Sequence, residues 1–323
     1  MGNSRIRMAA ALAIPTLFLA ACGGQDDSGT DAGASNGAAA SGEVRVDGSS
    51  TVGPLTAAAG ELFKATPEGS GINVSVGQSG TGGGFQKFCA GETDISDASR
   101  PIKDEEAAVC ATAGIEYAEI PVANDALTVI VNTENDWAKC LTVAELTKMW
   151  EPAAEDTITN WSQVRDGFPD VPLELFGAGT DSGTFDYFTD VINGEEGASR
   201  TDYNPSEDDN ITVTGVEGTP GGLGYLGYSY FEANMDKLIA VEVDNGDGCV
   251  APSVESASDG TYAPLSRPLF IYPSKSAMQR AEVSAFVDFY VNNDAAITEK
   301  ALFVPLNAEQ QEQAKEAMAT VVG

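Results

Sequence analysis

Short apolar strands alternate with amphipathic helices along most of the chain. The first strand is predicted at residues 43–46, and the helix after it places apolar residues on one face from Leu55 to Phe63. A second strand at residues 72–76 leads into a further helix, predicted around residues 85–90. Because strands that alternate with helices form a mostly parallel sheet, the pattern predicts an α/β fold whose ligand site lies at the carboxyl ends of the strands.

The same alternation restarts in the middle of the chain and returns near its end. Residues 126–132 form an apolar run, as expected for a strand covered on both faces. The remaining predicted elements are a helix at 143–150, a strand at 173–177, a helix with Phe185, Phe188 and Ile192 on one face, a strand at 268–272, and helices at 281–291 and 308–321. At 323 residues, the chain is long enough for about two domains.

The segment before the first strand has the features of an export signal followed by a tether. Arg5 and Arg7 precede an apolar run that is too short to span a bilayer and is typical of a signal peptide, assigned here to residues 1–21. The run ends in Leu-Ala-Ala-Cys, which resembles a bacterial lipobox. This resemblance implies a lipid on Cys22 and an exported protein anchored to the cell membrane, facing the periplasm or the exterior; an incidental cysteine is the alternative. Residues 22–42 lack an apolar period and predict a lipidated, flexible tether.

The composition narrows the possible functions. The chain contains no histidine, which excludes a Ser-His-Asp triad, a Cys-His dyad and zinc sites with histidine ligands. The motifs of serine hydrolases, S-x-x-K enzymes and P-loop proteins are also absent, so no enzyme, cofactor or metal site is predicted. Seventeen basic against 49 acidic residues give a formal charge of −32, which argues against nucleic acid as a partner.

Three turns carry the same polar chemistry, each between a predicted strand and a predicted helix. They are Ser50-Thr51, Ser79-Gly80-Thr81-Gly82 and Ser182-Gly183-Thr184. A helix N-terminus offers unpaired N–H groups and a partial positive charge, and hydroxyls and glycines suit close contact with an anion. Helix capping is the alternative for any one turn. Together the three turns predict a site for a tetrahedral oxyanion that binds through local dipoles.

Several longer motifs resemble the phosphate-binding proteins of bacterial phosphate ABC transporters, the Pst-type substrate-binding proteins. They are DGSSTVGPL (47–55), GQSGTGGGFQKFCAGETDISDASRPIK (77–103), PVANDALTVIVN (121–132), LTVAELTKMWEP (141–152), GTDSGTFDYFTDVI (179–192) and TPGGLGYLGYSYF (219–231). The resemblance implies a type II periplasmic-binding-protein fold, with lobe I at residues 43–125 plus 264–323 and lobe II at residues 126–263. It also implies a monomer that closes over inorganic phosphate and delivers it to permease subunits.

Other functions remain as alternatives. A receptor for sulfate or molybdate would keep the same class of protein. A secreted hydrolase or an adhesin would be a different class. The sequence offers a hydrolase no activated nucleophile, general base or metal-ligand cluster, and an adhesin would leave the three equivalent turns without a role.

Carried over from the family, the phosphate donors are the Ser50 hydroxyl, the Thr51 N–H, Ser79, Ser182, Gly183 and Thr184. The chain departs from the family pattern at two positions, because Ala178 stands where many members have an arginine and Ser99 where they have the aspartate that accepts the phosphate proton. We expect Ser99 to bond the anion and Arg100 to be the cationic donor, with a surface or domain-stabilising ion pair as the alternative for Arg100. Asp181 and Asp97 are the candidates for the proton acceptor.

The four cysteines other than Cys22 predict two disulfides, for which three pairings are possible. Cys89–Cys110 and Cys140–Cys249 are favoured, and free thiols are the alternative. The two lobes implied by the resemblance support this pairing, because each bridge then lies within one lobe and leaves the hinge free.

Overall fold

The computed structural model describes residues 41–322. Cys22, the predicted signal peptide and residues 22–40 of the predicted tether lie outside the described residues. No described helix is long and apolar enough to cross a membrane.

One nine-stranded sheet runs through the described part of the chain, in the order β2-β1-β3-β12-β4-β8-β6-β7 with β9 beside β4. Its strands are β1 (Ser41–Gly48), β2 (Gly71–Gln78), β3 (Ile95–Ala98), β4 (Ile120–Asn132), β6 (Glu174–Ala178), β7 (Asn204–Ser206), β8 (Gly222–Gly227), β9 (Leu238–Ala240) and β12 (Ser266–Pro273). A smaller sheet contains β5 (Cys140–Thr142), β10 (Glu242–Asp244) and β11 (Cys249–Val250).

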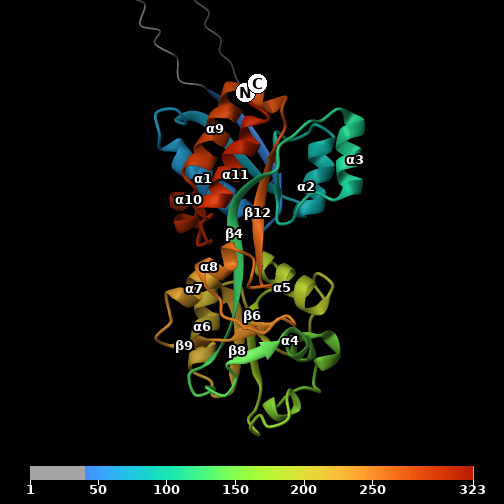
Figure 1. The fold of residues 1–323 in the computed structure, drawn as a ribbon, viewed down its shortest axis with the longest axis vertical. Helices are drawn as coiled ribbons and strands as arrows, with labels where there is room; N and C mark the ends of the chain where they lie inside the picture. Colours follow the sequence, from blue (N-terminus) through green and yellow to red (C-terminus); the bar gives the residue numbers. More distant parts are fainter. Residues whose placement is uncertain (1–40, 323) are drawn as a thin grey trace, which may run out of the picture. The chain divides into compact units, whose positions relative to one another are not determined.

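Helices cover the sheet in two groups (Figure 1). They are α1 (Gly53–Lys64), α2 (Gly80–Cys89), α3 (Asp104–Ala113), α4 (Val143–Trp150), α5 (Gly183–Asn193), α6 (Asp209–Glu217), α7 (Tyr228–Glu232), α8 (Val254–Ser258), α9 (Ala281–Asn292), α10 (Asp294–Ala301) and α11 (Ala308–Ala319). The α/β class predicted from the sequence is therefore confirmed.

Two strands connect the groups of helices. β4 and β12 run side by side in opposite directions between the two halves of the described chain (Figure 1). All 13 residues of β4 are buried, and β4 pairs with β12 in its first part and with β8 and β9 in its second. We call the half that contains β1–β3 and α1 the first lobe and the half that contains β6–β8 and α5 the second lobe.

Each lobe has its own hydrophobic core. In the first lobe, α1 and α9 pack on β1 and β12 around Leu55, Phe63 and Phe286. In the second lobe, a core around Trp150, Phe188 and Tyr225 joins α4 and α5 to β8. The rings of Phe188 and Tyr225 stack with their centroids 3.8 Å apart.

The sheet is mixed rather than mostly parallel, which corrects the expectation from the sequence. β1 pairs in parallel with β2 and β3, and β6 pairs in parallel with β7 and β8, as the strand–helix alternation predicts. β4 and β12 pair antiparallel with each other and with β8 and β3, respectively. The chain crosses between the lobes once in each direction, so these two strands necessarily run in opposite directions.

The helices also differ from the prediction. α2 begins at Gly80 instead of near residue 85, so it absorbs most of the glycine-rich turn. A Cβ atom on Gly84 would lie 2.5 Å from Gly48 Cα, so the glycine lets α2 pack closely against the end of β1. The periodic pattern did not reveal α3, whose only buried residue is Cys110.

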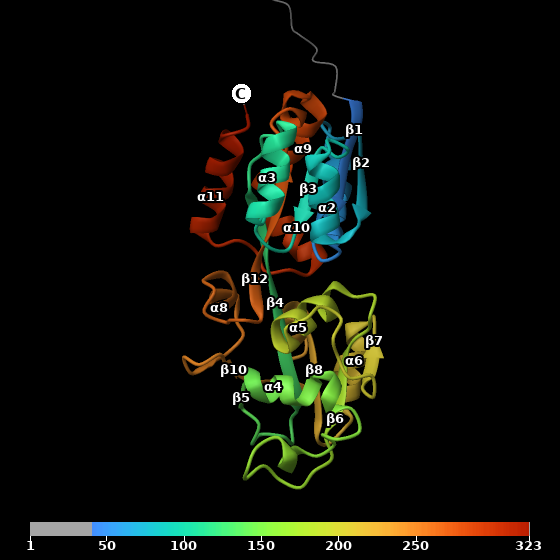
Figure 2. The ribbon, with the colours of Figure 1, turned by 90° about the vertical axis from the view of Figure 1, so that its right-hand side faces the viewer.

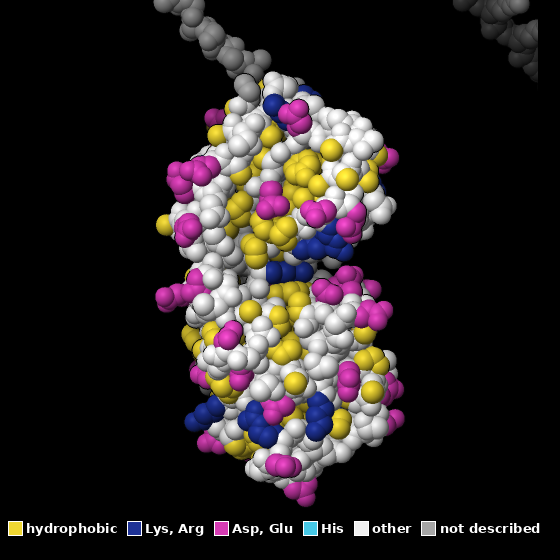
Figure 3. Space-filling model, turned by 45° about the vertical axis from the view of Figure 1, so that its right-hand side comes forward, with side chains coloured by type: hydrophobic (Ala, Val, Ile, Leu, Met, Phe, Trp, Pro, Cys, Tyr) yellow, Lys and Arg dark blue, Asp and Glu magenta, His cyan; other side chains and the backbone are white. Residues whose placement is uncertain are grey.

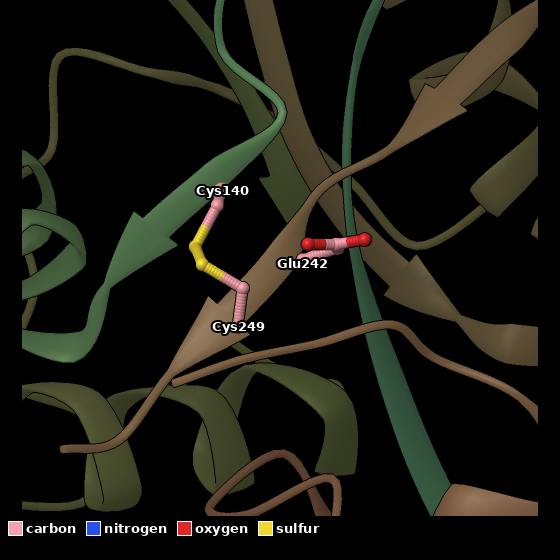
Figure 4. A group of neighbouring side chains, drawn as sticks. All are labelled: Cys140, Glu242 and Cys249. Atoms are coloured by element: carbon pink, nitrogen blue, oxygen red, sulfur yellow. A yellow bond between two sulfur atoms is a disulfide. The ribbon is translucent and has the colours of Figure 1, made fainter. Parts of the chain in front are cut away.

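The structure contains both predicted disulfides. Cys89 at the end of α2 is bonded to Cys110 of α3, and Cys140 of β5 is bonded to Cys249 of β11. Each bridge lies within one lobe. Glu242 lies beside the second bridge (Figure 4), but the two sulfurs are joined to each other and leave no thiolate for a metal ion.

Candidate anion-binding site

A cavity of about 520 Å³ opens where the two lobes face each other. Its walls are Ser49–Thr51, Ser79–Gly82, Ser99, Arg100 and Lys103 from the first lobe, Asp186, Tyr187, Asp190 and Glu196 from the second, and Arg267 from β12. Lys and Arg side chains gather at this junction in the space-filling view (Figure 3). The cavity brings two of the three predicted hydroxyl-rich turns together.

The N-terminus of α2 points its backbone at this cavity. Gly80, Thr81 and Gly82 form its first turn and line the wall, and no side chain caps the helix. The first N–H groups of a helix have no partner within the helix, and they carry the positive end of its dipole. This turn therefore has the geometry and the electrostatics that suit an anion.

Ser99 and Thr81 form a hydroxyl pair beside the α2 N-terminus. Their hydroxyl oxygens are 3.0 Å apart, and the Ser99 N–H donates to Thr81 Oγ1 at 3.2 Å. Since one hydroxyl donates to the other, the accepting hydroxyl keeps its own hydrogen for a ligand. Ser99 and Thr81 both line the cavity.

Ser79 lines the cavity, but its hydroxyl hydrogen is already used. It donates to Asp47 Oδ1, while Lys87 Nζ contacts the other oxygen of Asp47 at 2.7 Å. Burial acts to raise the pKa of Asp47, but the hydrogen bonds from Lys87 and Ser79 outweigh it and lower that pKa. Donation from Ser79 to an anion therefore requires the hydroxyl to leave an ionised carboxylate.

The first turn presents the Ser50 and Thr51 side chains. Ser49 is buried beneath them, and its Oγ accepts from the N–H groups of Thr51 at 3.2 Å and Val52 at 3.4 Å. The Thr51 N–H, predicted as an anion donor, is therefore bonded to Ser49 in this arrangement. The hydroxyl of Ser50 makes no hydrogen bond to another described residue, which leaves it available.

The third turn begins α5, which lies on the side of the second lobe that faces the first (Figure 2). Ser182 caps this helix, because its Oγ accepts from the Thr184 N–H at 3.1 Å. Gly183 lies against Thr51, since a Cβ atom on Gly183 would be 2.6 Å from Thr51 Oγ1. Ser182, Gly183 and Thr184 adjoin the first turn but do not line the cavity in this arrangement.

Arg100 lines the cavity and forms the ion pair that was its alternative interpretation. Its Nη1 and Nη2 donate to the two oxygens of Glu106 at 2.9 Å and 2.8 Å. The hydrogen bonds from Arg100 lower the pKa of Glu106 against the effect of burial. Both terminal nitrogens of Arg100 are thus directed at a carboxylate.

Arg267 is the cation that the sequence analysis missed. It lies on β12, contacts Asp125 and Thr51, and stands 3.6 Å above the centre of the Tyr187 ring. Arg267 lies outside every hydroxyl-rich turn. The sequence feature that could have indicated it is its position directly before the strand predicted at residues 268–272. Only the course of β12 through the junction brings it to the cavity.

Acidic side chains line the second-lobe wall of the cavity. Asp186 and Asp190 lie one turn apart on α5, with Glu196 after the helix. Burial and the charge of Glu196 raise the pKa of Asp186, with Arg267 opposing them. The two carboxylates considered from the sequence lie elsewhere: Asp181 is exposed, and Asp97 is buried behind the first turn and accepts from Thr56.

Fold and cavity together define the class of protein: a substrate-binding protein of the type II periplasmic-binding-protein fold. A family model described as "PBP superfamily domain" matches residues 33–294. Protein SphX of Synechocystis is 49% identical over 267 residues, which cover 82% of this chain and 79% of SphX. The phosphate-binding protein PstS of Staphylococcus saprophyticus is 34% identical over 310 residues, 95% of this chain and 92% of PstS.

A solved structure shows the same fold. It is titled as a possible phosphate binding protein from Planctomyces limnophilus and is 44% identical, with a TM-score of 0.82, covering 88% of this chain and all of the other. The chain belongs to the PBP superfamily and, within it, to the family of Pst-type substrate-binding proteins. The family resemblance noted from the sequence motifs is confirmed.

Proposed function

We propose that this protein binds inorganic phosphate outside the cytoplasm and delivers it to the permease subunits of an ABC importer. Membership of the family supports this proposal, as do relatives named as phosphate-binding proteins. We further propose that the protein acts as a monomer without catalysis, and that a lipid on Cys22 holds it at the membrane.

The observation that carries the proposal is the uncapped N-terminus of α2 at the cavity wall. Its N–H groups, together with the hydroxyls of Ser50, Thr81 and Ser99, form a set of neutral donors. Neutral donors suit this protein, because its charge of −32 repels anions at long range and leaves binding to local dipoles.

We propose that the lobes, with boundaries at residues 43–125 plus 264–323 and 126–263, close over the bound phosphate. The proposed contacts are Ser50, Thr51, Ser79, Ser99, Ser182, Gly183 and Thr184. Arg100, the cationic donor expected from the sequence, bonds Glu106 in this arrangement. Closure supplies the third turn, because Gly183 already adjoins Thr51 in the arrangement described here. The hydrogen bonds that now engage the Thr51 N–H and the Ser79 hydroxyl would be exchanged for bonds to the anion.

Calorimetric titration of the purified, exported chain tests the function. The protein is first unfolded and refolded with its disulfides intact to remove ligand acquired during expression. We expect 1:1 binding of phosphate and much weaker binding of sulfate. Equal binding of the two anions would reassign the ligand, and binding of neither would contradict the receptor function.

A further inference from the structure

Arg267 occupies a position that no other cation of the cavity shares. It lies on β12, one of the two strands that connect the lobes, and its side chain is 19% exposed. The two other cations of the wall, Arg100 and Lys103, both belong to the first lobe. Among the described cations of the cavity wall, Arg267 is therefore the one that lies on a strand connecting the lobes, where it can contact a bound anion from the hinge.

Three neighbours hold the Arg267 side chain in place. Nε donates to Asp125 Oδ2 on β4 at 3.3 Å, and Nη2 donates to Thr51 Oγ1 in the first lobe at 3.2 Å. The guanidinium also lies 3.6 Å above the Tyr187 ring of the second lobe, and the Tyr187 hydroxyl is itself anchored to the Pro264 carbonyl at 2.7 Å. Such stacking and ion pairing preorganise the planar fork of an arginine.

The guanidinium keeps most of its donors available. Of its five N–H groups, one bonds Asp125 and one bonds Thr51, which leaves three, including both on Nη1. Arg100 differs, because Glu106 takes both of its terminal nitrogens in a bidentate pair. Each arginine has a carboxylate partner, so the difference between them lies in which nitrogens are engaged: Arg100 uses Nη1 and Nη2, whereas Arg267 uses Nε and Nη2 and keeps Nη1 free of described partners.

We propose that Arg267 is the charged residue that contacts the bound phosphate, in place of Arg100. This inference rests on the proposed function. An arginine fork matches two oxygens of a tetrahedral oxyanion, and Thr51, having accepted from Arg267, can donate its own hydroxyl hydrogen to the same anion. Because Arg267 touches Thr51 in one lobe and Tyr187 in the other, an anion bound to it favours the arrangement in which the lobes face each other.

The acidic side chains on the second-lobe wall of the cavity make the contact between Arg267 and the anion important for affinity. Asp186 lies on the cavity and interacts electrostatically with Arg267. If the guanidinium is removed, the cavity keeps Arg100 and Lys103 on its first-lobe wall but loses the cation that opposes the charge of Asp186. Like charges at a partly buried contact are unfavourable, so neutralising Arg267 should weaken anion binding strongly.

The test is phosphate titration of Arg267→Gln and Arg267→Lys beside the wild type. Arg165→Gln is a matched control, because Arg165 also bonds a carboxylate, Glu145, and stacks on an aromatic ring, Phe168, outside this cavity. We expect Arg267→Gln to bind phosphate at least about 100-fold more weakly, and Arg165→Gln to bind like the wild type. Arg267→Lys should recover part of the affinity, because it keeps the charge and loses the fork.

Thermal unfolding with and without phosphate separates binding from folding. Because Arg267→Gln also removes the ion pair with the buried Asp125, each variant is compared with itself, and a lost anion contact appears as the loss of the upward shift that phosphate produces. If Arg267→Gln does not fold, Arg267→Lys provides the same comparison. Wild-type affinity in both Arg267 variants, or a 100-fold loss in Arg100→Gln alone, would overturn the inference and leave the receptor function intact. Failure of the wild type to bind phosphate would contradict the proposed function itself.

Discussion

Gly183 at the start of α5 lies against Thr51, across the boundary between the two lobes. A Cβ atom on Gly183 would come within 2.6 Å of Thr51 Oγ1 and 3.1 Å of its backbone nitrogen. Real Cβ atoms essentially never approach this closely, so a side chain here would push the two turns apart. The sequence proposed Gly183 as a phosphate donor, and the structure adds a second reason for glycine at this position.

Gly183→Ala should therefore lower phosphate affinity by about tenfold or more, since overpacking a tight contact typically costs 1–3 kcal/mol. The phosphate-free protein should unfold at nearly the wild-type temperature, because the lobes can separate to relieve the clash. Calorimetry and thermal unfolding measure the two effects. Gly227→Ala is the control, because its nearest neighbour, Tyr230 Cδ2, is 3.7 Å away. Wild-type affinity in Gly183→Ala would show that the two turns need not meet in the bound state.

Asp97 should make stability fall as the pH rises. It is fully buried, its Oδ1 accepts from Thr56 at 2.9 Å, and its Oδ2 has no partner among the described residues. Burial raises the pKa of Asp97 to about 8. Between its unfolded value near 4 and this folded value, the folded state holds one more proton than the unfolded chain, so the free energy of unfolding decreases with pH.

Asp97→Asn should remove this dependence, which amounts to at most about 1.4 kcal/mol per pH unit. Urea unfolding at pH 5, 7 and 9 measures it as the difference between variant and wild type. We expect the free energy of unfolding of the variant, relative to that of the wild type, to increase steadily with pH up to about pH 8. Above pH 8 this difference should remain constant. Asp236→Asn, at an exposed position, is the control. Parallel pH profiles of Asp97→Asn and the wild type would contradict an uncharged Asp97.

Asp186 should discriminate between phosphate and sulfate. Its carboxylate lies on the cavity wall, so it can accept the hydrogen that phosphate retains but repels fully ionised sulfate. Asp186→Asn should raise sulfate affinity and reduce the phosphate-to-sulfate ratio by about tenfold. Calorimetry at pH 7 with both anions tests this, with Asp190→Asn as a control of smaller effect because solvent screens that exposed carboxylate.

The pH dependence of sulfate binding gives a second readout for Asp186. A bound anion further raises the pKa of this carboxyl, which burial has already raised, so binding takes up a proton. Sulfate affinity of the wild type should therefore increase as the pH falls, and that slope should be shallower in Asp186→Asn. Equal slopes in the two proteins would assign the proton to another group.

The Cys140–Cys249 bridge should contribute to stability without affecting ligand binding. It closes a loop with a sequence separation of 109, for which restricting the unfolded chain is worth about 5 kcal/mol. Because both cysteines belong to the second lobe, their replacement leaves the movement of the lobes unchanged. The double variant Cys140→Ala/Cys249→Ala should thus unfold at lower urea concentration and still bind phosphate with wild-type affinity. A loss of less than about 1 kcal/mol would contradict this estimate.

Local patterns predicted much of the secondary structure. The helix at residues 143–150 matches α4, and the buried faces of α5 and α9 match the apolar periods at Phe185–Ile192 and Val283–Val291. These elements were predictable because helix and strand periods are written in consecutive residues. α3 was not, because it is held to α2 by a disulfide and lacks an apolar stripe.

The sequence by itself determined the alternation of elements, the hydroxyl-rich turns, the absence of histidine and the family. The tertiary structure decided which of the hydroxyl-rich turns lie together at the cavity and that Arg267 lies beside them. Arg267 is 216 residues from Thr51 and 142 from Asp125 along the chain, so no local period or turn motif could join them. Arg100 stood within a family motif, yet the start of α3, only six residues further on, places Glu106 against both of its terminal nitrogens. For Arg267 the physical reason is that hydrogen-bond partners depend on distance in space, and β4 and β12 bring Arg267 to Asp125 and Thr51 by crossing between the lobes.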